Sequence, residues 1–126
     1  MIQPAPDYDA IVRVVQLYID GFGDSDAAKF EEAFDKDAWI FYTDADGRLH
    51  KNLIRESFQY WVSPQPRMSG RIISVTQVGD AANVVLRIGS AKPSDSWVDL
   101  HSLIRVDGLW KITNKTATHA SRAGGI

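Results

Sequence analysis

The feature that most constrains the fold is a change in hydrophobic periodicity near residue 70. Before this point, apolar side chains recur every three or four residues, which is typical of amphipathic helices. After it they recur at every second residue, which is typical of strands with two different faces. Helices followed by an antiparallel series of strands favour an α+β layer fold over alternating βαβ units.

The first two helices are predicted close to the start of the chain. Residues 8–22 carry a single apolar stripe, and Asp7 stands where an N-cap residue belongs. A second, shorter helix is predicted to begin after a cap at Asp24 or Asp26 and to end near Phe34. A tight link between two such helices indicates a helical hairpin.

The next segment is predicted to contain one strand and one helix. Residues 39–43 are bulky and β-prone, and residues 44–47 have the composition of a turn. Asn52 is expected to cap a third helix, which prolines within 63–66 would end. We therefore expect three helices packed on a curved antiparallel sheet, in a single domain over residues 1–126.

Four long strands are predicted after residue 70. The strongest turn signal is Asp107-Gly108, because a two-residue Asp-Gly loop favours a type I′ hairpin. The predicted strands are residues 71–78, 83–91, 97–106 and 109–118.

The Asp107-Gly108 loop also predicts which side chains share a face of its hairpin. Counting outward from the loop places Asp99 and His101 on one face, opposite Thr116 and Asn114. We expect this face to meet the helices, because the large aromatic residues of the hairpin lie on it. A register slip of one residue would reverse these assignments.

The opposite face of the same hairpin is also apolar, with Val98, Leu100 and Ile104. A sheet of an isolated α+β domain usually has one wet face, so a second cover is needed here. We expect that cover to be another copy of the chain, which predicts a homodimer through the sheet. Lys115 is expected on this face, in an interface or surface role rather than as a Schiff-base lysine.

Two stretches of sequence carry a family resemblance. The first is Tyr18-Ile-Asp-Gly-Phe-Gly-Asp-Ser-Asp, followed by Phe30 to Phe34 and Asp37-Ala38; the second is Trp97-Val-Asp-Leu-His-Ser-Leu with Asp107-Gly-Leu-Trp-Lys-Ile-Thr-Asn-Lys. Together they resemble NTF2-like proteins, most closely the SnoaL-like branch described as putative lumazine-binding. The resemblance implies a cone-shaped α+β domain with a small-molecule pocket, often as a homodimer. It does not imply one reaction, because this fold hosts isomerases, dehydratases, cyclases, epoxide hydrolases and binding modules.

Asp99 and His101 are the leading candidates for acid–base chemistry. Residues two apart on a strand point the same way, and burial moves both pKa values toward neutrality. Asn114 and Thr116 would orient the pair or contact a ligand. The alternative is structural, since a buried carboxyl on an inner strand is often a satisfied core group.

Two tyrosines complete the predicted set of polar groups. Tyr18 matches, by resemblance, the tyrosine that ketosteroid isomerases use as an oxyanion donor, although it also belongs to the apolar stripe of its helix. The basic carboxylate of those isomerases is replaced by Tyr42, which argues against steroid-type proton shuttling. A dehydratase-like set of Tyr18, Tyr42, Asp99 and His101 fits better. The predicted pocket walls are aromatic: Trp39, Phe41, Phe58, Trp61 and Trp97.

Several classes of function receive no support from the sequence. The chain has no cysteine, and its three histidines lack metal-ligand spacing, so we expect neither a metal nor another cofactor. A net charge of −2 gives no reason to expect nucleic acid as a partner. No signal peptide or apolar span is apparent, so we expect a cytoplasmic location away from membranes.

Three hypotheses follow for the function. The first is a module that binds a small, planar, partly apolar molecule without chemistry. The second is a cofactor-free isomerase or dehydratase with Asp99 and His101 as its acid–base pair and Tyr18 or Tyr42 as oxyanion partner. The third is a protein-interaction domain, which would need an exposed apolar patch beyond the dimer face.

Overall fold

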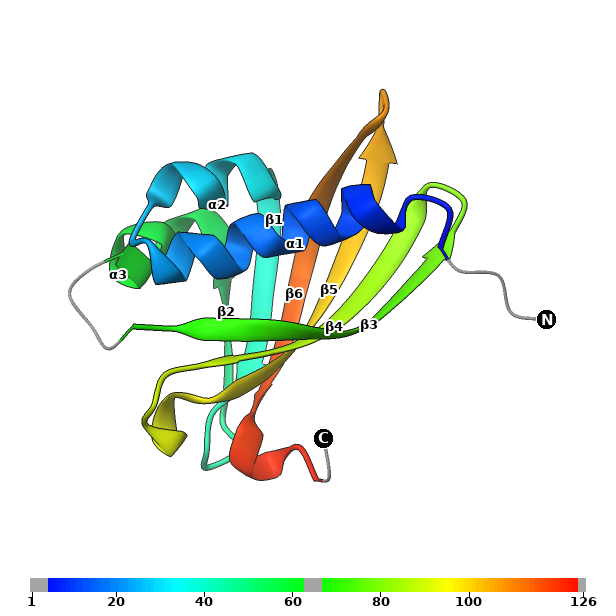
Figure 1. The fold of residues 1–126 in the computed structure, drawn as a ribbon. Helices are drawn as coiled ribbons and strands as arrows, with labels where there is room; N and C mark the ends of the chain where they lie inside the picture. The colour runs from blue at the N-terminus through cyan, green and yellow to red at the C-terminus, as the bar shows by residue number, and fades with distance from the viewer. Residues whose placement is uncertain (1–4, 63–66, 125–126) are drawn as a thin grey trace.

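The computed structural model describes residues 5–62 and 67–124, and it packs three helices on one face of a strongly curved six-stranded sheet (Figure 1). The expected α+β architecture is therefore confirmed. The helices are α1 (Tyr8–Gly23), α2 (Ala27–Ala33) and α3 (Phe58–Val62). The strands are β1 (Phe34–Thr43), β2 (Leu49–Leu53), β3 (Ser69–Val78), β4 (Ala81–Gly89), β5 (Trp97–Val106) and β6 (Leu109–His119).

The strand order across the sheet is β2-β1-β6-β5-β4-β3. The pairs β3–β4, β4–β5 and β5–β6 are antiparallel, as expected, and the pair β1–β2 is antiparallel as well. The pair β1–β6 is parallel, which makes the sheet mixed. Strand β6 therefore lies between β1 and β5, and it connects the β2–β1 pair to the antiparallel strands β5, β4 and β3.

The ends of the first two helices follow from local polar contacts. Asp26 caps α2, because its side chain accepts a hydrogen bond from the backbone N–H of Ala28 at 3.0 Å. Asp7 occupies the N-cap position of α1 but makes no such bond. Its carboxylate instead accepts hydrogen bonds from Arg105 and from Trp110 Nε1, which ties the start of α1 to the sheet.

The segment between β1 and β3 differs most from the sequence-based expectation. Strand β1 already begins at Phe34, and the turn over 44–47 leads into β2, which was not predicted. Asn52 lies within β2 and does not cap a helix; its side-chain amide donates to Leu53 O and Ser57 Oγ. A 3₁₀ turn (Ile54–Ser57) precedes α3, and the helix stop predicted at 63–66 lies outside the described residues.

The β5–β6 hairpin has the predicted register only near its turn. Leu103 pairs with Ile112 as expected, but Ser102 pairs with Asn114, so Thr113 is an extra residue in β6. Such a β-bulge opposes two residues to one, so each β6 residue beyond it faces the opposite way from the predicted regular register, while the faces of β5 are unchanged. The predicted partners of Asp99 and His101 are therefore wrong, since these residues pair with Ala117 and Lys115.

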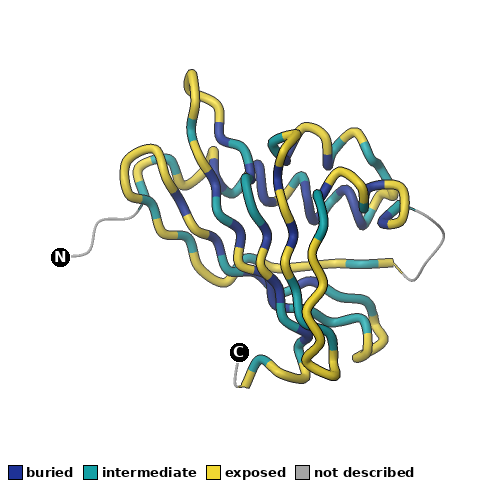
Figure 2. The backbone as a smooth tube through the Cα atoms, turned by 180° about the vertical axis from the view of Figure 1, so that it is seen from behind, coloured by how far each residue is buried: buried dark blue, intermediate teal, exposed yellow. Residues whose placement is uncertain are grey.

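The two faces of the sheet differ in what covers them. The inner face packs against the helices around an aromatic cluster in which Phe30 stacks on Phe58, with ring centroids 5.5 Å apart. The outer face is seen in Figure 2, where yellow exposed segments alternate with blue buried ones along the strands. It carries Trp39, Phe41 and Leu100, which are 43%, 37% and 49% exposed.

Candidate functional site

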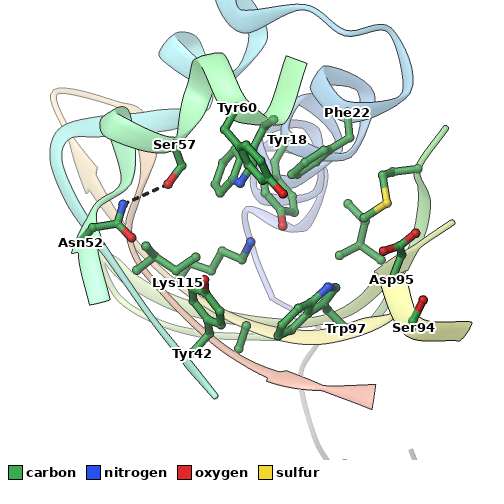
Figure 3. Close-up of a pocket in the computed structure, with 15 residues that line it drawn as sticks. Tyr18, Phe22, Tyr42, Asn52, Ser57, Tyr60, Ser94, Asp95, Trp97 and Lys115 are labelled. Atoms are coloured by element: carbon green, nitrogen blue, oxygen red, sulfur yellow. Dashed lines mark hydrogen bonds between the residues drawn. The ribbon is translucent and has the colours of Figure 1, made fainter. Parts of the chain in front are cut away.

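A cavity of about 270 Å³ opens between the helices and the inner face of the sheet (Figure 3). Its walls come from α1, α3 and the strands β1, β2, β4, β5 and β6, together with the turns between them. The lining residues are Tyr18, Phe22, Ile40, Tyr42, Asn52, Ser57, Tyr60, Trp61, Met68, Ile88, Ser94, Asp95, Trp97, Lys115 and Ala117.

Lys115 crosses the middle of this cavity, contrary to its expected place on the outer face (Figure 3). The bulge at Thr113 turns its side chain inward, and only 8% of that side chain remains exposed. The Nζ atom lies 4.6 Å from the ring centroid of Trp61 and 4.9 Å from that of Tyr18. At these distances, both aromatic faces attract its positive charge.

A polar network lies beneath Lys115, with the Asp99 carboxylate at its centre. The Tyr18 hydroxyl donates to Asp99 Oδ2 at 2.6 Å, and His101 Nε2 lies 3.4 Å from the same oxygen. Lys115 Nζ lies 3.7 Å from that oxygen, an ion-pair distance. Asp99 and His101 are fully buried and are not among the lining residues, whereas Tyr18 and Lys115 line the cavity.

The charges of this network follow from burial and mutual contact. Burial raises the pKa of Asp99, but the Lys115 charge and the contacts from His101 and Tyr18 outweigh it and leave that pKa below its usual value. Burial lowers the pKa of His101, so the imidazole is neutral. Burial also raises the pKa of Tyr18 well above its usual value, with the Asp99 charge adding to the effect, so Tyr18 remains a hydrogen-bond donor.

Two atoms of the network have no hydrogen-bond partner among the described residues. They are Asp99 Oδ1 and His101 Nδ1, both fully enclosed. If His101 is assigned the tautomer that donates from Nε2 to Asp99, Nδ1 is left as an acceptor. Unsatisfied buried polar atoms cost free energy, so this region is less favourable than an ordinary packed core.

The aromatic walls face one another across the cavity. Tyr42 meets Trp97 edge to face, with ring centroids 5.4 Å apart, and stacks on His50 from the neighbouring strand. Trp61 of α3 also lines the cavity, with Lys115 Nζ near its ring. A flat, partly apolar molecule fits such walls, because aromatic rings offer large contact areas with defined geometry.

The rim near β5 is a short loop held by the end of β6. Ser94 and Asp95 line the cavity from a 3₁₀ turn (Pro93–Asp95). His119 Nε2 contacts Ser94 O at 2.9 Å, and the His119 ring packs edge to face on Trp97. These contacts fix the rim in relation to the aromatic wall.

Five predicted ligand-binding residues lie elsewhere. Trp39 and Phe41 are exposed on the outer face, because Ile40 and Tyr42 take the inward positions of β1. Asn114 and Thr116 also face outward beyond the bulge, where they bond to each other at 3.0 Å. Phe58 is buried in the aromatic core and is not among the lining residues.

The structure brings four of the predicted residues to the cavity wall: Tyr18, Tyr42, Trp61 and Trp97. Sequence reasoning assigned Lys115 to the outer face and therefore did not predict it as a lining residue. It also missed several polar groups that line the cavity, namely Asn52, Ser57, Tyr60, Ser94 and Asp95. Asn52 lies in β2 and bonds to Ser57 in the following 3₁₀ turn, and β2 had no strong sequence signal.

The chemistry open to this site is that of one cation (Lys115), one carboxylate (Asp95), an amide and several hydroxyl groups in a partly apolar cavity. Within residues 5–62 and 67–124, no three His, Asp or Glu side chains are placed to hold a metal ion. In the same part of the chain, no helix has the length and apolar character needed to cross a membrane.

Comparison with protein families gives one match. A family model described as "Putative lumazine-binding" matches residues 6–117. No curated protein matches the chain.

Solved structures with the same fold are numerous. An NTF2-like protein of unknown function from Shewanella baltica OS155 is 26% identical, covers 93% of this chain and 96% of its own, and superposes with a TM-score of 0.78. A second, from Methylobacillus flagellatus KT, is also 26% identical, with 92% and 94% of the chains covered and a TM-score of 0.77. A cystatin-like domain of unknown function from Nostoc punctiforme PCC 73102, at 17% identity, covers 93% and 79% with a TM-score of 0.71.

Proposed function

Because the chain belongs to the putative lumazine-binding family, we propose that it binds one small, planar, partly apolar molecule in the cavity above Lys115 and releases it unchanged. The observation that carries this proposal is the cavity itself. Its volume of about 270 Å³ lies close to the lower end of the range for small-molecule sites, and aromatic rings form its walls.

The polar groups of the cavity support a ligand that carries an acceptor oxygen. Lys115 Nζ lies 3.7 Å from its ion-pair partner Asp99 Oδ2 and has three donor hydrogens, so it can donate to a ligand as well. Its charge is already balanced by Asp99, so a neutral carbonyl oxygen suits this position better than a second anion. Bicyclic heterocycles with ring carbonyls, such as lumazine, combine both features.

Binding is tested by thermal shift and isothermal titration calorimetry with lumazine. A flavin, a steroid and an aromatic carboxylic acid serve as comparison ligands. A ligand that binds only the native state raises the melting temperature, and the rise increases with ligand concentration. We expect saturable binding of one molecule per chain for a planar carbonyl heterocycle. Absence of binding for all four classes would contradict the proposal.

Two tryptophans provide a matched pair of variants for this test. Trp97 lines the cavity, whereas Trp39 is exposed on the outer face of the sheet. Trp97→Leu should weaken binding by about tenfold, because it removes an aromatic contact of the order of 1 kcal/mol or more. Trp39→Leu should leave the affinity unchanged. Equal effects of the two substitutions on affinity would mean that the ligand does not bind in the cavity.

One observation favours an enzyme of the isomerase or dehydratase type as a second candidate. Asp99 and His101 lie beneath the cavity, yet both contact groups that line it or pack against it. Proton transfer to a ligand would therefore pass through Tyr18 or Lys115 rather than directly from the Asp99–His101 pair. Mass spectrometry and NMR of a recovered ligand decide between the two functions, because an enzyme returns an isomer or a dehydrated product.

We also propose that two copies of the chain associate through the outer face of the sheet. Phe41, Thr116 and Leu100 lie side by side across three neighbouring strands, and a row of this kind can pair with itself around a two-fold axis. Phe41→Lys should then give monomers in light scattering after size exclusion, with an unchanged circular dichroism spectrum. A wild-type chain that is already monomeric at micromolar concentration would refute the dimer.

A further inference from the structure

The amine of Lys115 is placed for covalent chemistry that binding alone does not require. It lines an aromatic cavity, and only 8% of its side chain is exposed. Its Nζ forms an ion pair with Asp99 Oδ2 at 3.7 Å, beyond the distance of a short hydrogen bond. An amine that lines a cavity and is held mainly by an ion pair can meet an electrophile that enters the cavity.

We propose that Lys115 captures aromatic aldehydes that enter the cavity and holds them as an imine on Nζ. The ligand class follows from the walls, because Trp97 and Tyr42 accept a flat ring while Nζ reaches its carbonyl carbon. This activity goes beyond the reversible binding proposed above and does not depend on lumazine being the ligand.

The buried partner of Lys115 makes the proton transfers possible. The attacking amine must be neutral, and burial lowers the pKa of Lys115 while the Asp99 charge opposes this effect. Transfer of a proton from Nζ to Asp99 keeps the net charge of the pair at zero. No isolated charge is then created in a site where it would be costly.

The reaction balances without an oxidant or a reductant. Neutral Nζ attacks the carbonyl carbon, a C–N bond forms, and the carbonyl π electrons move to oxygen. The oxygen takes up one of the two protons of the attacking nitrogen, which leaves a neutral nitrogen with its lone pair. The protonated Asp99 carboxyl then returns its proton to the resulting hydroxyl group, and one water molecule leaves as the nitrogen lone pair forms the C=N bond. The protonated imine that remains is again a cation beside the Asp99 carboxylate, so the original ion pair is restored.

Reductive trapping with benzaldehyde tests this proposal. Cyanoborohydride converts an imine to a stable benzylamine, and peptide mapping by mass spectrometry then gives the initial labelling rate at each lysine. Lys51 and Lys92 are exposed and serve as internal references. We expect Lys115 to be labelled roughly tenfold faster or more, because binding in the cavity concentrates the aldehyde beside its amine. Labelling of Lys115 at or below the rates of the exposed lysines would overturn the proposal.

Two variants test whether the fast labelling depends on Lys115. Lys115→Arg keeps a positive charge beside Asp99 but cannot form the imine, so the fast phase of labelling should disappear. Lys51→Arg should leave that phase intact. If Lys115→Arg fails to fold, the site-resolved rates of the wild-type chain still decide the question.

These experiments distinguish a failure of the imine proposal from a failure of the proposed binding function. Lumazine that binds by calorimetry and slows labelling of Lys115 supports both. Lumazine binding without fast labelling at Lys115 overturns the imine alone. Fast labelling at Lys115 with no binding of any planar heterocycle overturns the proposed binding function alone.

Discussion

The Tyr18 hydroxyl donates a hydrogen bond of 2.6 Å to Asp99 Oδ2, and this contact joins α1 to β5 across the full depth of the core. Both side chains are fully buried. Tyr18 also meets the rings of Phe22, Phe34 and Trp61 edge to face, so its position is fixed by packing as well as by the hydrogen bond. The Tyr18 hydroxyl is therefore held in a fixed position relative to the Asp99 carboxylate.

Tyr18→Phe is expected to destabilise the fold without changing its shape. The phenylalanine ring keeps the aromatic contacts, but the buried carboxylate loses a donor, which costs about 1.5–3 kcal/mol for a bond to a charged group. Urea unfolding followed by circular dichroism gives the difference in free energy of unfolding. Tyr8→Phe is a suitable comparison, because Tyr8 is 48% exposed and does not line the cavity. Equal stabilities of the two variants would mean that the Tyr18 hydroxyl contributes nothing.

Asp99→Asn should reduce stability at neutral pH by about 3 kcal/mol, because it leaves the buried Lys115 charge without its partner. The exposed pair of Asp37 with Arg55 provides the contrast, since Asp37→Asn should cost less than about 1 kcal/mol. Both values come from urea titrations at pH 7.

The same substitution should also change the dependence of stability on pH. The folded pKa of Asp99 is depressed, so its contribution is present above the unfolded value of 3.8 and is lost as the pH falls through the folded pKa. The wild-type chain should therefore lose more stability below pH 3.8 than Asp99→Asn does. Parallel curves for the two proteins would show that Asp99 is protonated to the same extent in both states.

Two glycines of α1 predict opposite responses to alanine. A Cβ atom at Gly21 would lie 2.6 Å from the Phe30 ring, whereas at Gly23 it would meet only Met68 O at 3.5 Å. Gly21→Ala should cost about 1–3 kcal/mol through overpacking. Gly23→Ala should be neutral or stabilise by up to about 1 kcal/mol, because alanine is the better helix former. Thermal unfolding of both variants checks the prediction, and a gain in stability for Gly21→Ala would contradict it.

Deletion of Thr113 tests the bulge in β6. Without this residue, a regular hairpin would keep Ser102 paired with Asn114 and His101 paired with Lys115, so Lys115 and Ala117 would stay on the inner face. We expect the deletion to cost about 1–3 kcal/mol, because the local bend of β6 is lost, and to leave ligand binding intact. Thr113→Val is the control, because it keeps the chain length and loses only the hydrogen bond to Ser102 O, worth about 1 kcal/mol. A deletion no more costly than this control would show that the bulge is not required.

Much of the fold could be predicted because its signals are local. The apolar stripe before Gly23 and the cap at Asp26 depend on neighbouring residues only, and the Asp107-Gly108 turn sets the first pairs of its hairpin. Strand β2 could not be predicted in this way. Its residues are mostly exposed, and pairing with β1 rather than hydrophobic alternation makes it a strand.

The candidate site was harder to predict, because it depends on one irregularity. Trp110 and Ile112 face inward with a spacing of two, but the next apolar residue is Ala117, five positions later. An odd spacing breaks the alternation and is itself a signal of a bulge. Without that signal, Lys115 is assigned to the wrong face, and two outward polar residues replace it in the predicted pocket.

The position of β6 between β1 and β5 has a consequence for synthesis on the ribosome. Until residues 109–119 emerge, β2 and β1 have no connection to β5, β4 and β3 within the sheet. Both halves then display open strand edges, which are prone to pair with other chains. The nascent chain must remain unassembled until its final strand is available, and this period is when chaperone binding would matter most.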